Sequence, residues 1–192
     1  MKVHLYATAL GAILLHSCTD RKQLSSIKDI QCEVMQGAQA TLENATVKKD
    51  SFVVQSLLVT NTFTAANWSF FNKAYAYSPA DPTIKMMEKI SDVKVYTVKD
   101  YNSRYPAGTD ISDSCRFQVF GYDMSYSSYD SKARFLKQAG DTPDDFTTKN
   151  ITSFNIKPMT YATSGTSQQL VVVIITNQNT MVRDTTVSFN IQ

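Results

Sequence analysis

Apolar and polar residues alternate over several short stretches of the chain, and this two-residue period is typical of half-buried β-strands. Within Ser91–Lys99, Val93 and Val95 point to one side of the predicted strand. Lys94 and Tyr96 point to the other side. The strands predicted from this pattern are Ile30–Met35, Ser51–Val59, Ser91–Lys99, Cys115–Tyr122 and Thr152–Met159.

The clearest hairpin lies at the C-terminal end of the sequence. Gln169–Thr176 (QLVVVIIT) is a continuous apolar run, which predicts a central strand covered on both faces. The polar segment Asn177–Thr180 (NQNT) then predicts a turn, and apolar and polar residues alternate again in Met181–Ile191. Two apolar stretches joined by a short polar segment are typical of a β-hairpin.

One segment, Asp130–Ala139 (DSKARFLKQA), has the pattern of a helix. Asp130 is the predicted cap, and Ala133, Leu136 and Ala139 share a face that would dock on a sheet. Several short strands with one docked helix predict an all-β fold, an immunoglobulin-like two-sheet β-sandwich. An α+β sheet covered by the helix is the alternative.

The first residues have the features of a secretory signal peptide. Lys2 and His4 precede the apolar run Leu5–Leu15, and the small residue Ser17 follows. A basic start, a short apolar core and a small residue before the cleavage point define such a peptide. The apolar run is too short to span a membrane, which takes roughly 20 residues. We therefore predict that residues 1–17 are removed.

The cleavage point resembles the lipobox of bacterial lipoproteins. In Leu15-His16-Ser17-Cys18, an aliphatic residue and a small residue precede a cysteine, as the lipoprotein peptidase requires. The resemblance implies that Cys18 is lipidated. Each buried methylene of an acyl chain contributes about 0.8 kcal/mol to membrane attachment, and two chains anchor stably. We expect residues 18–28 to form a lipidated tether and residues 29–192 a single extracytoplasmic domain.

Removal of the signal peptide narrows the chemistry that is open to the protein. The two histidines, His4 and His16, both lie in the removed segment. The remaining chain therefore lacks the base of Ser-His-Asp and Cys-His catalysis and the imidazole ligands of zinc sites. The whole chain carries a net charge of +2, which falls near neutral without Lys2. No electrostatic footprint for nucleic acid remains.

Two cysteines, Cys32 and Cys115, remain besides Cys18. In an oxidising compartment a Cys32–Cys115 disulfide is the natural pairing. Two separate buried thiols are the alternative. Neither cysteine has a histidine base beside it, so a role as nucleophile is not favoured.

The acidic residues show no catalytic or metal-binding pattern. The segment 141–145 (DTPDD) lacks the alternating ligands and the glycine of a calcium loop, so we expect a solvated loop and no metal or other cofactor. Glu33, Glu43 and Glu88 are not spaced in a way that would pair two of them for hydrolysis. We expect the protein not to be an enzyme.

Aromatic residues are the main candidates for a binding surface. Aromatic rings stack on sugars and anchor protein interfaces, and tyrosines separated by polar serines occur in Met124–Tyr129. The alternative is that these rings fill the core. The candidate binding residues are Trp68, Tyr75, Tyr126 and Tyr129.

The stretch Ala74–Asp113 resembles a family of uncharacterised lipoproteins from Bacteroidota gut bacteria. The similarity rests on the segment Tyr75–Pro79 (YAYSP) before a strand, the pair Tyr101-Asn102 and the loop Gly108–Asp110 (GTD). The later helix and closing hairpin follow in a similar order. The resemblance implies a cell-envelope location and carries over no catalytic residue.

The location within the envelope follows from the residues after the lipobox. Surface-exported lipoproteins of these bacteria are similar to one another in an acidic cluster after the lipidated cysteine, whereas here only Asp20 is acidic. This favours an outer-membrane lipoprotein on the periplasmic face over the cell surface. Asp184-Thr185-Thr186 also resembles the short O-glycosylation motif of these bacteria, which makes Thr185 a candidate site.

The leading hypothesis is therefore a lipid-anchored envelope protein whose β-sandwich binds a partner without catalysis. The partner would be another envelope protein or a glycan. A histidine-independent hydrolase that acts on glycans with two carboxylates is the second hypothesis. An accessory structural subunit of a surface filament or transport complex is the third, and it would expose a large apolar patch or an unpaired strand edge.

Overall fold

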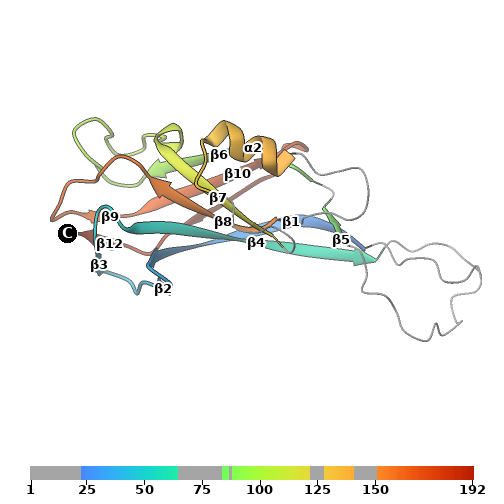
Figure 1. Cartoon of the computed structure of the whole chain (residues 1–192), viewed down its shortest axis with the longest axis horizontal. Helices are drawn as coiled ribbons and strands as arrows, with labels where there is room; N and C mark the ends of the chain where they lie inside the picture. Colours follow the sequence, from blue (N-terminus) through green and yellow to red (C-terminus); the bar gives the residue numbers. More distant parts are fainter. Residues whose placement is uncertain (1–22, 65–83, 87, 122–127, 141–150) are drawn as a thin grey trace, which may run out of the picture.

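Two long antiparallel strands, β1 (Gln23–Gln36) and β4 (Phe52–Thr64), form the backbone of the larger sheet. The computed structural model describes residues 23–64, 84–86, 88–121, 128–140 and 151–192. Within these ranges the chain is mostly β-sheet with one α-helix (Figure 1).

The larger sheet continues beyond β4 with β8 (Ile151–Pro158) and then β7 (Cys115–Gly121), both antiparallel to their neighbours. Two short strands pair with the other edge of β1. They are β2 (Gln39–Ala40) near its end and β5 (Ile84–Met86) at its start. The sheet order is therefore β2-β1-β4-β8-β7.

The second sheet has β10 (Leu170–Thr176) at its centre, between β6 (Ile90–Thr97) and β11 (Met181–Thr185). The predicted hairpin is confirmed, because β10 and β11 pair antiparallel across a tight turn. In that turn Asn179 adopts a φ of 62°, a left-handed conformation that asparagine tolerates well.

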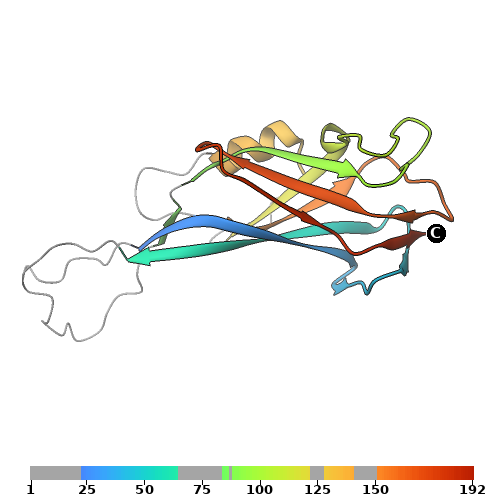
Figure 2. The ribbon, with the colours of Figure 1, turned by 180° about the vertical axis from the view of Figure 1, so that it is seen from behind.

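A third, small sheet lies at the end of the molecule near the C-terminus (Figure 2). Its strands are β3 (Ala45–Val47), β12 (Phe189–Ile191) and β9 (Ser167–Gln168). The predicted strand Met181–Ile191 is thus divided between two sheets: β11 ends at Thr185, and β12 begins only at Phe189.

The connectivity is that of an immunoglobulin-like sandwich, as predicted. In the larger sheet the strands lie side by side in the order β1-β4-β8-β7. The strands β6, β10 and β11 form the other in the order β11-β10-β6. These are the A-B-E-D and G-F-C arrangements of the constant-type immunoglobulin fold.

The core lies between the two sheets, and its residues are cross-strand neighbours within each sheet. Val34, Val54, Ile156 and Phe117 form one row across the four strands of the larger sheet, and all are almost completely buried. The inward residues of β6 and β10 face this layer, including Val93, Val95, Leu170, Val172 and Ile174. Alternation along the chain predicts β6, whereas the continuous apolar run Gln169–Thr176 predicts β10.

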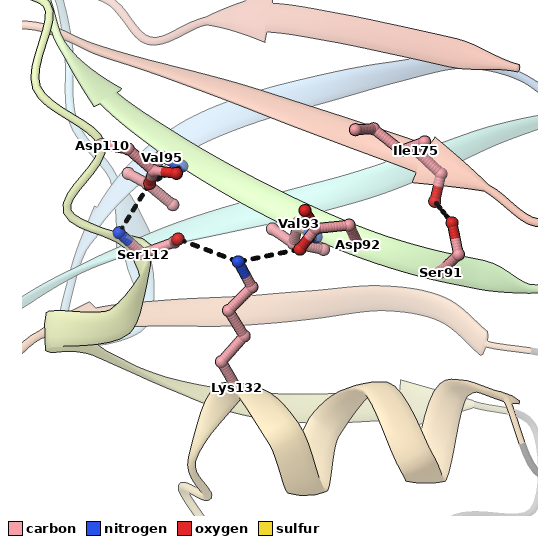
Figure 3. A network of polar contacts seen from close by, with 8 residues as sticks. All are labelled: Ser91, Asp92, Val93, Val95, Asp110, Ser112, Lys132 and Ile175. Carbon is pink, nitrogen blue, oxygen red and sulfur yellow. Dashed lines mark hydrogen bonds and ion pairs between the residues drawn. The ribbon is translucent and has the colours of Figure 1, made fainter. Parts of the chain in front are cut away.

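The helix α2 (Lys132–Gly140) closes one side of the sandwich between β6 and β7. Phe135 is fully buried, and its ring stacks on Phe117 of β7 at 5.0 Å and tilts against Phe154 of β8 at 5.1 Å. Nζ of Lys132 reaches across to β6 and lies 2.8 Å from Oδ1 of Asp92 (Figure 3). It also donates to Oγ of Ser112 at 3.1 Å.

The helix was predicted in nearly the right place, but its cap and its buried face differ. It begins at Lys132, and the hydroxyl of Ser131 accepts a hydrogen bond from the backbone of Arg134. Asp130 instead pairs through its backbone with Phe117. Ala133 is exposed, because Phe135 and Ala139, four residues apart, face the sheet.

The prediction of a tether over residues 18–28 is wrong for its second half. β1 begins at Gln23, and Ser25 and Ile27 point into the sandwich with exposures of 2% and 3%. Serine at an inward position concealed the alternation in the sequence. The strand therefore starts seven residues before the predicted Ile30.

On the side opposite α2, a single carboxylate links the edges of the two sheets. Oδ2 of Asp184 on β11 accepts a hydrogen bond of 2.7 Å from the backbone N–H of Cys32 on β1. Its other oxygen accepts the N–H of Thr185 at 2.7 Å. The carboxylate of Asp184 thus joins β1 to β11 at a position where a backbone carbonyl would otherwise accept the hydrogen bond.

Candidate functional site

Most of the aromatic residues predicted to bind a partner lie outside the described residues, as do the lipidation site and the acidic loop. These are Cys18, Trp68, Tyr75, Tyr126 and the segment 141–145. Tyr129 is described, and it lies next to Lys157, whose Nζ is 5.9 Å from the ring centroid. Partial burial raises the pKa of Tyr129, and the structure brings no other predicted aromatic to it within the described part.

The predicted disulfide is wrong, because Cys32 and Cys115 are two separate buried thiols. They lie on β1 and β7, with β4 and β8 between them. Three strand spacings of about 4.8 Å separate these strands, whereas a disulfide needs Cα atoms within about 7 Å. Cys115 is also offset by four residues along β7 from Val119, which lies in the same row as Cys32.

Each buried thiol has one weak polar contact. Sγ of Cys32 lies 3.6 Å from Oγ of Ser56, and Sγ of Cys115 donates to the carbonyl of Ile111 at 3.3 Å. Burial raises the pKa of both thiols to about 12. The thiolate is the reactive form of cysteine, so neither residue is suited to act as a nucleophile.

We expect both thiols to resist alkylation in the folded protein. In the Cys18→Ala chain, iodoacetamide near pH 8 should modify neither cysteine until urea unfolds the domain, after which both should react. Mass spectrometry before and after unfolding gives the measurement. Modification of either residue at the same rate in the folded and unfolded chain would contradict their burial.

Within the described ranges, the outer face of the β11-β10-β6 sheet is the strongest candidate for a binding site. The residues of β10 alternate between the core and this face. Val171, Val173 and Ile175 form the outward set and lie outside the core cluster. Val171 and Ile175 are half-buried, whereas Val173 between them is only 7% exposed. They line an open hollow with a volume of about 520 Å³, which is within the range of small-ligand sites.

Strand register arranges charged and uncharged side chains around this apolar line. Val173 pairs with Lys94 of β6 on one side and with Arg183 of β11 on the other. Val171 pairs in the same way with Tyr96 and with Thr185. The hollow therefore has an aliphatic floor between two cationic side chains, all of which line it.

Neither cation of the hollow has an ion-pair partner among the described residues. Within the described part of the chain, the ion pairs are Lys132–Asp92 and Arg134–Asp130, and neither involves Lys94 or Arg183. Two strand spacings separate the Lys94 and Arg183 backbones, or about 10 Å. A ligand that combines an apolar surface with negative charges on both sides would satisfy this arrangement.

The candidate glycosylation residue, Thr185, lies exposed on β11 at the margin of this face. Its modification stays a prediction. The face itself was missed in the sequence, where the run Gln169–Thr176 indicated a strand covered on both sides. The side chains that flank it, Lys94 and Arg183, come from strands whose adjacency to β10 becomes known only from the fold.

Other kinds of site find no support in the described ranges. Those ranges contain no group of three or more His, Cys, Asp or Glu side chains that could hold a metal ion. No helix within them is long and apolar enough to cross a bilayer. Comparisons with protein-family models, curated proteins and solved structures find no match to this chain.

Proposed function

We propose that the chain is a lipid-anchored, extracytoplasmic binding protein of the bacterial cell envelope, and that it holds a partner protein on the outer face of the β11-β10-β6 sheet. The observation that carries this proposal is the aliphatic line Val171, Val173 and Ile175 between two cations without ion-pair partners in the described residues. The proposed activity is binding without catalysis.

The envelope location rests on the sequence. The signal-peptide pattern and Cys18 support a lipoprotein, and the single acidic residue Asp20 after it favours the periplasmic side of the outer membrane. The resemblance of Ala74–Asp113 to envelope lipoproteins agrees with this location.

A protein partner is favoured over a glycan by the chemistry of the floor. Sugar rings stack on flat aromatic faces, whereas the floor here is built from branched aliphatic side chains, with Tyr96 as the one aromatic residue in the described lining. Such side chains pack with the apolar residues of another protein and contribute about 25 cal/mol for each Å² of apolar surface they bury. The exposed side chain of Met181 extends the same surface at its edge.

Photocrosslinking in intact cells tests the proposal. We expect a photoreactive residue placed at Met181, which is 64% exposed beside the hollow, to form a discrete protein adduct. The same residue at Leu42, which is 83% exposed between β2 and β3, is the matched control and should form none. Arg183→Glu combined with the Met181 probe should weaken the adduct. Equal labelling from both positions, or none from Met181, would refute the binding face.

The anchor is tested in the same cells. The Cys18→Ala variant should leave the membrane fraction, because it cannot be acylated. Retention in membranes at the level of the parent would remove the lipid anchor from the proposal while leaving the binding face to stand on its own result.

A further inference from the structure

The shape of the outer face restricts what the partner can present to it. The floor is one straight line of side chains along β10, from Val171 to Ile175. The four residue steps from Val171 to Ile175 span about 13 Å. An α-helix covers that length with roughly nine residues, so two to three helical turns would match the floor.

The two cations lie to either side of that line and not along it. Lys94 and Arg183 are cross-strand neighbours of the same residue, Val173, and their backbones are about 10 Å apart. A helix with its side chains is about 10–12 Å wide. A helix lying along β10 can therefore place one carboxylate beside each cation while its apolar stripe covers the floor.

An extended segment fits this arrangement less well. A strand presents a single row of side chains to the surface beneath it, so its apolar and acidic residues would compete for the same line. A helix presents an apolar stripe with separate positions on both flanks. The flanking positions of the two cations thus favour the helix.

Among the described residues, the charge on this face is positive. Asp92 pairs across from Ile175, but its carboxylate is already bound by Lys132 (Figure 3). The other residues that line the hollow carry no charge; they are Tyr96, Thr97, Val98, Gly108 and Met181. Lys94 and Arg183 therefore give the face a positive character that complements an acidic partner.

We propose that the partner docks through an acidic amphipathic α-helix, which lies along β10 with an apolar stripe on Val171, Val173 and Ile175 and with carboxylates beside Lys94 and Arg183. This inference rests on the proposed binding function and specifies the chemistry of its partner. Recognition of an amphipathic helix by an apolar groove is a recurring mode of peptide binding.

The test uses a synthetic helical peptide with a leucine stripe flanked by glutamates, labelled for fluorescence anisotropy. Its matched probe has lysine in place of each glutamate. The protein is the full chain carrying Cys18→Ala, so that no acyl chain competes for the apolar stripe. We expect the acidic peptide to bind about tenfold more tightly than the basic one, with a preference that weakens as salt is raised.

Charge reversal should invert this preference. In the Lys94→Glu/Arg183→Glu variant we expect the basic peptide to bind more tightly than the acidic one. Arg116→Glu, an equal change at an exposed position of β7 in the other sheet, should leave the preference as it is in the parent. Circular dichroism would verify that each variant is folded.

Several outcomes would overturn the inference. These are equal binding of the two peptides, loss of preference without inversion, or tighter binding of an extended acidic peptide whose prolines prevent helix formation. Binding to phosphatidylglycerol vesicles without binding to the acidic peptide would assign the face to a membrane instead. If the Met181 adduct still forms in cells after such a result, the proposed binding function stands and only the helical partner is wrong.

Discussion

Raising the pH above about 9 should progressively destabilise the domain, because two buried thiols resist ionisation. Burial raises the pKa of Cys32 and Cys115 from 9.0 to about 12 in the folded protein. Above pH 9 the unfolded chain releases these protons and the folded chain retains them. The unfolded state then gains free energy relative to the folded state, so stability is complete below pH 9 and declines toward pH 12.

The expected effect is large compared with the stability of a typical domain. Each thiol should lower the free energy of unfolding by on the order of 1 kcal/mol for each pH unit above 9, as far as its raised folded-state pKa of about 12. Native domains are stable by about 5–15 kcal/mol, so the two thiols together should remove a large part of the stability by about pH 12. Burial also raises the pKa of Tyr101, which adds to the decline at the highest pH.

Urea titrations at a series of pH values would measure the decline in the Cys18→Ala chain. Replacing Cys32 with alanine should remove about half of the slope that is due to thiols, and replacing Cys115 as well should remove the rest. Both substitutions also cost stability by creating cavities, but that cost does not depend on pH. An unchanged slope in the doubly substituted chain would show that the thiols are not responsible.

The Phe135→Ala variant should lose about 3–5 kcal/mol of stability, the usual cost of removing a buried aromatic ring. Phe135 is fully buried, and its ring contacts Phe117 and Phe154 from the two strands beneath the helix. Without it α2 keeps the smaller apolar contacts of Ala139 and Leu136 and polar contacts such as Lys132 with Asp92. A nine-residue helix is too short to form without tertiary packing.

Urea denaturation followed by fluorescence or circular dichroism would measure this loss. Phe135→Leu, which retains an apolar side chain in the same place, should cost less than Phe135→Ala. Lys137→Ala, at an exposed position of the same helix, should stay within about 0.5 kcal/mol of the parent. A Phe135→Ala variant that is as stable as the Lys137→Ala variant would show that the ring does not hold the helix in place.

Local alternation was sufficient to predict the fold class. Val93, Val95 and Thr97 are buried on one side of β6, as their period indicates, and the β10–β11 hairpin has its polar turn where NQNT predicts it. These features depend on neighbours along the chain. Such patterns identify strands well because the side-chain period of a strand is fixed by its backbone.

Features that depend on distant neighbours were predicted less well. A Cys32–Cys115 disulfide was predicted because only these two cysteines remain besides Cys18. The strand order β1-β4-β8-β7 shows that two strands separate them. The start of β1 was missed because Ser25 is polar yet buried beside β4. Ser25 is buried because β1 pairs with β4 at this point, where its partner is Thr62, nearly forty residues later in the chain.

The candidate site is another feature that depends on residues far apart in the sequence. In the sequence Lys94 and Arg183 are almost ninety residues apart, and each looks like an ordinary outward residue of an alternating strand. Their meeting on either side of Val173 requires the registers of both β6 and β11 on β10. The run QLVVVIIT indicated an apolar strand but not that one of its faces lines a hollow.

The early start of β1 sets how far the domain can move from its proposed anchor. Gln23 is already paired with β4 and β5, at the end of the sandwich opposite the C-terminus (Figure 1). With Cys18 acylated, this end stays within about 18 Å of the attachment point, the reach of five extended residues. A tether of this length would confine the domain to a thin layer beside the bilayer. It would also raise the effective concentration of the domain toward partners held in the same membrane.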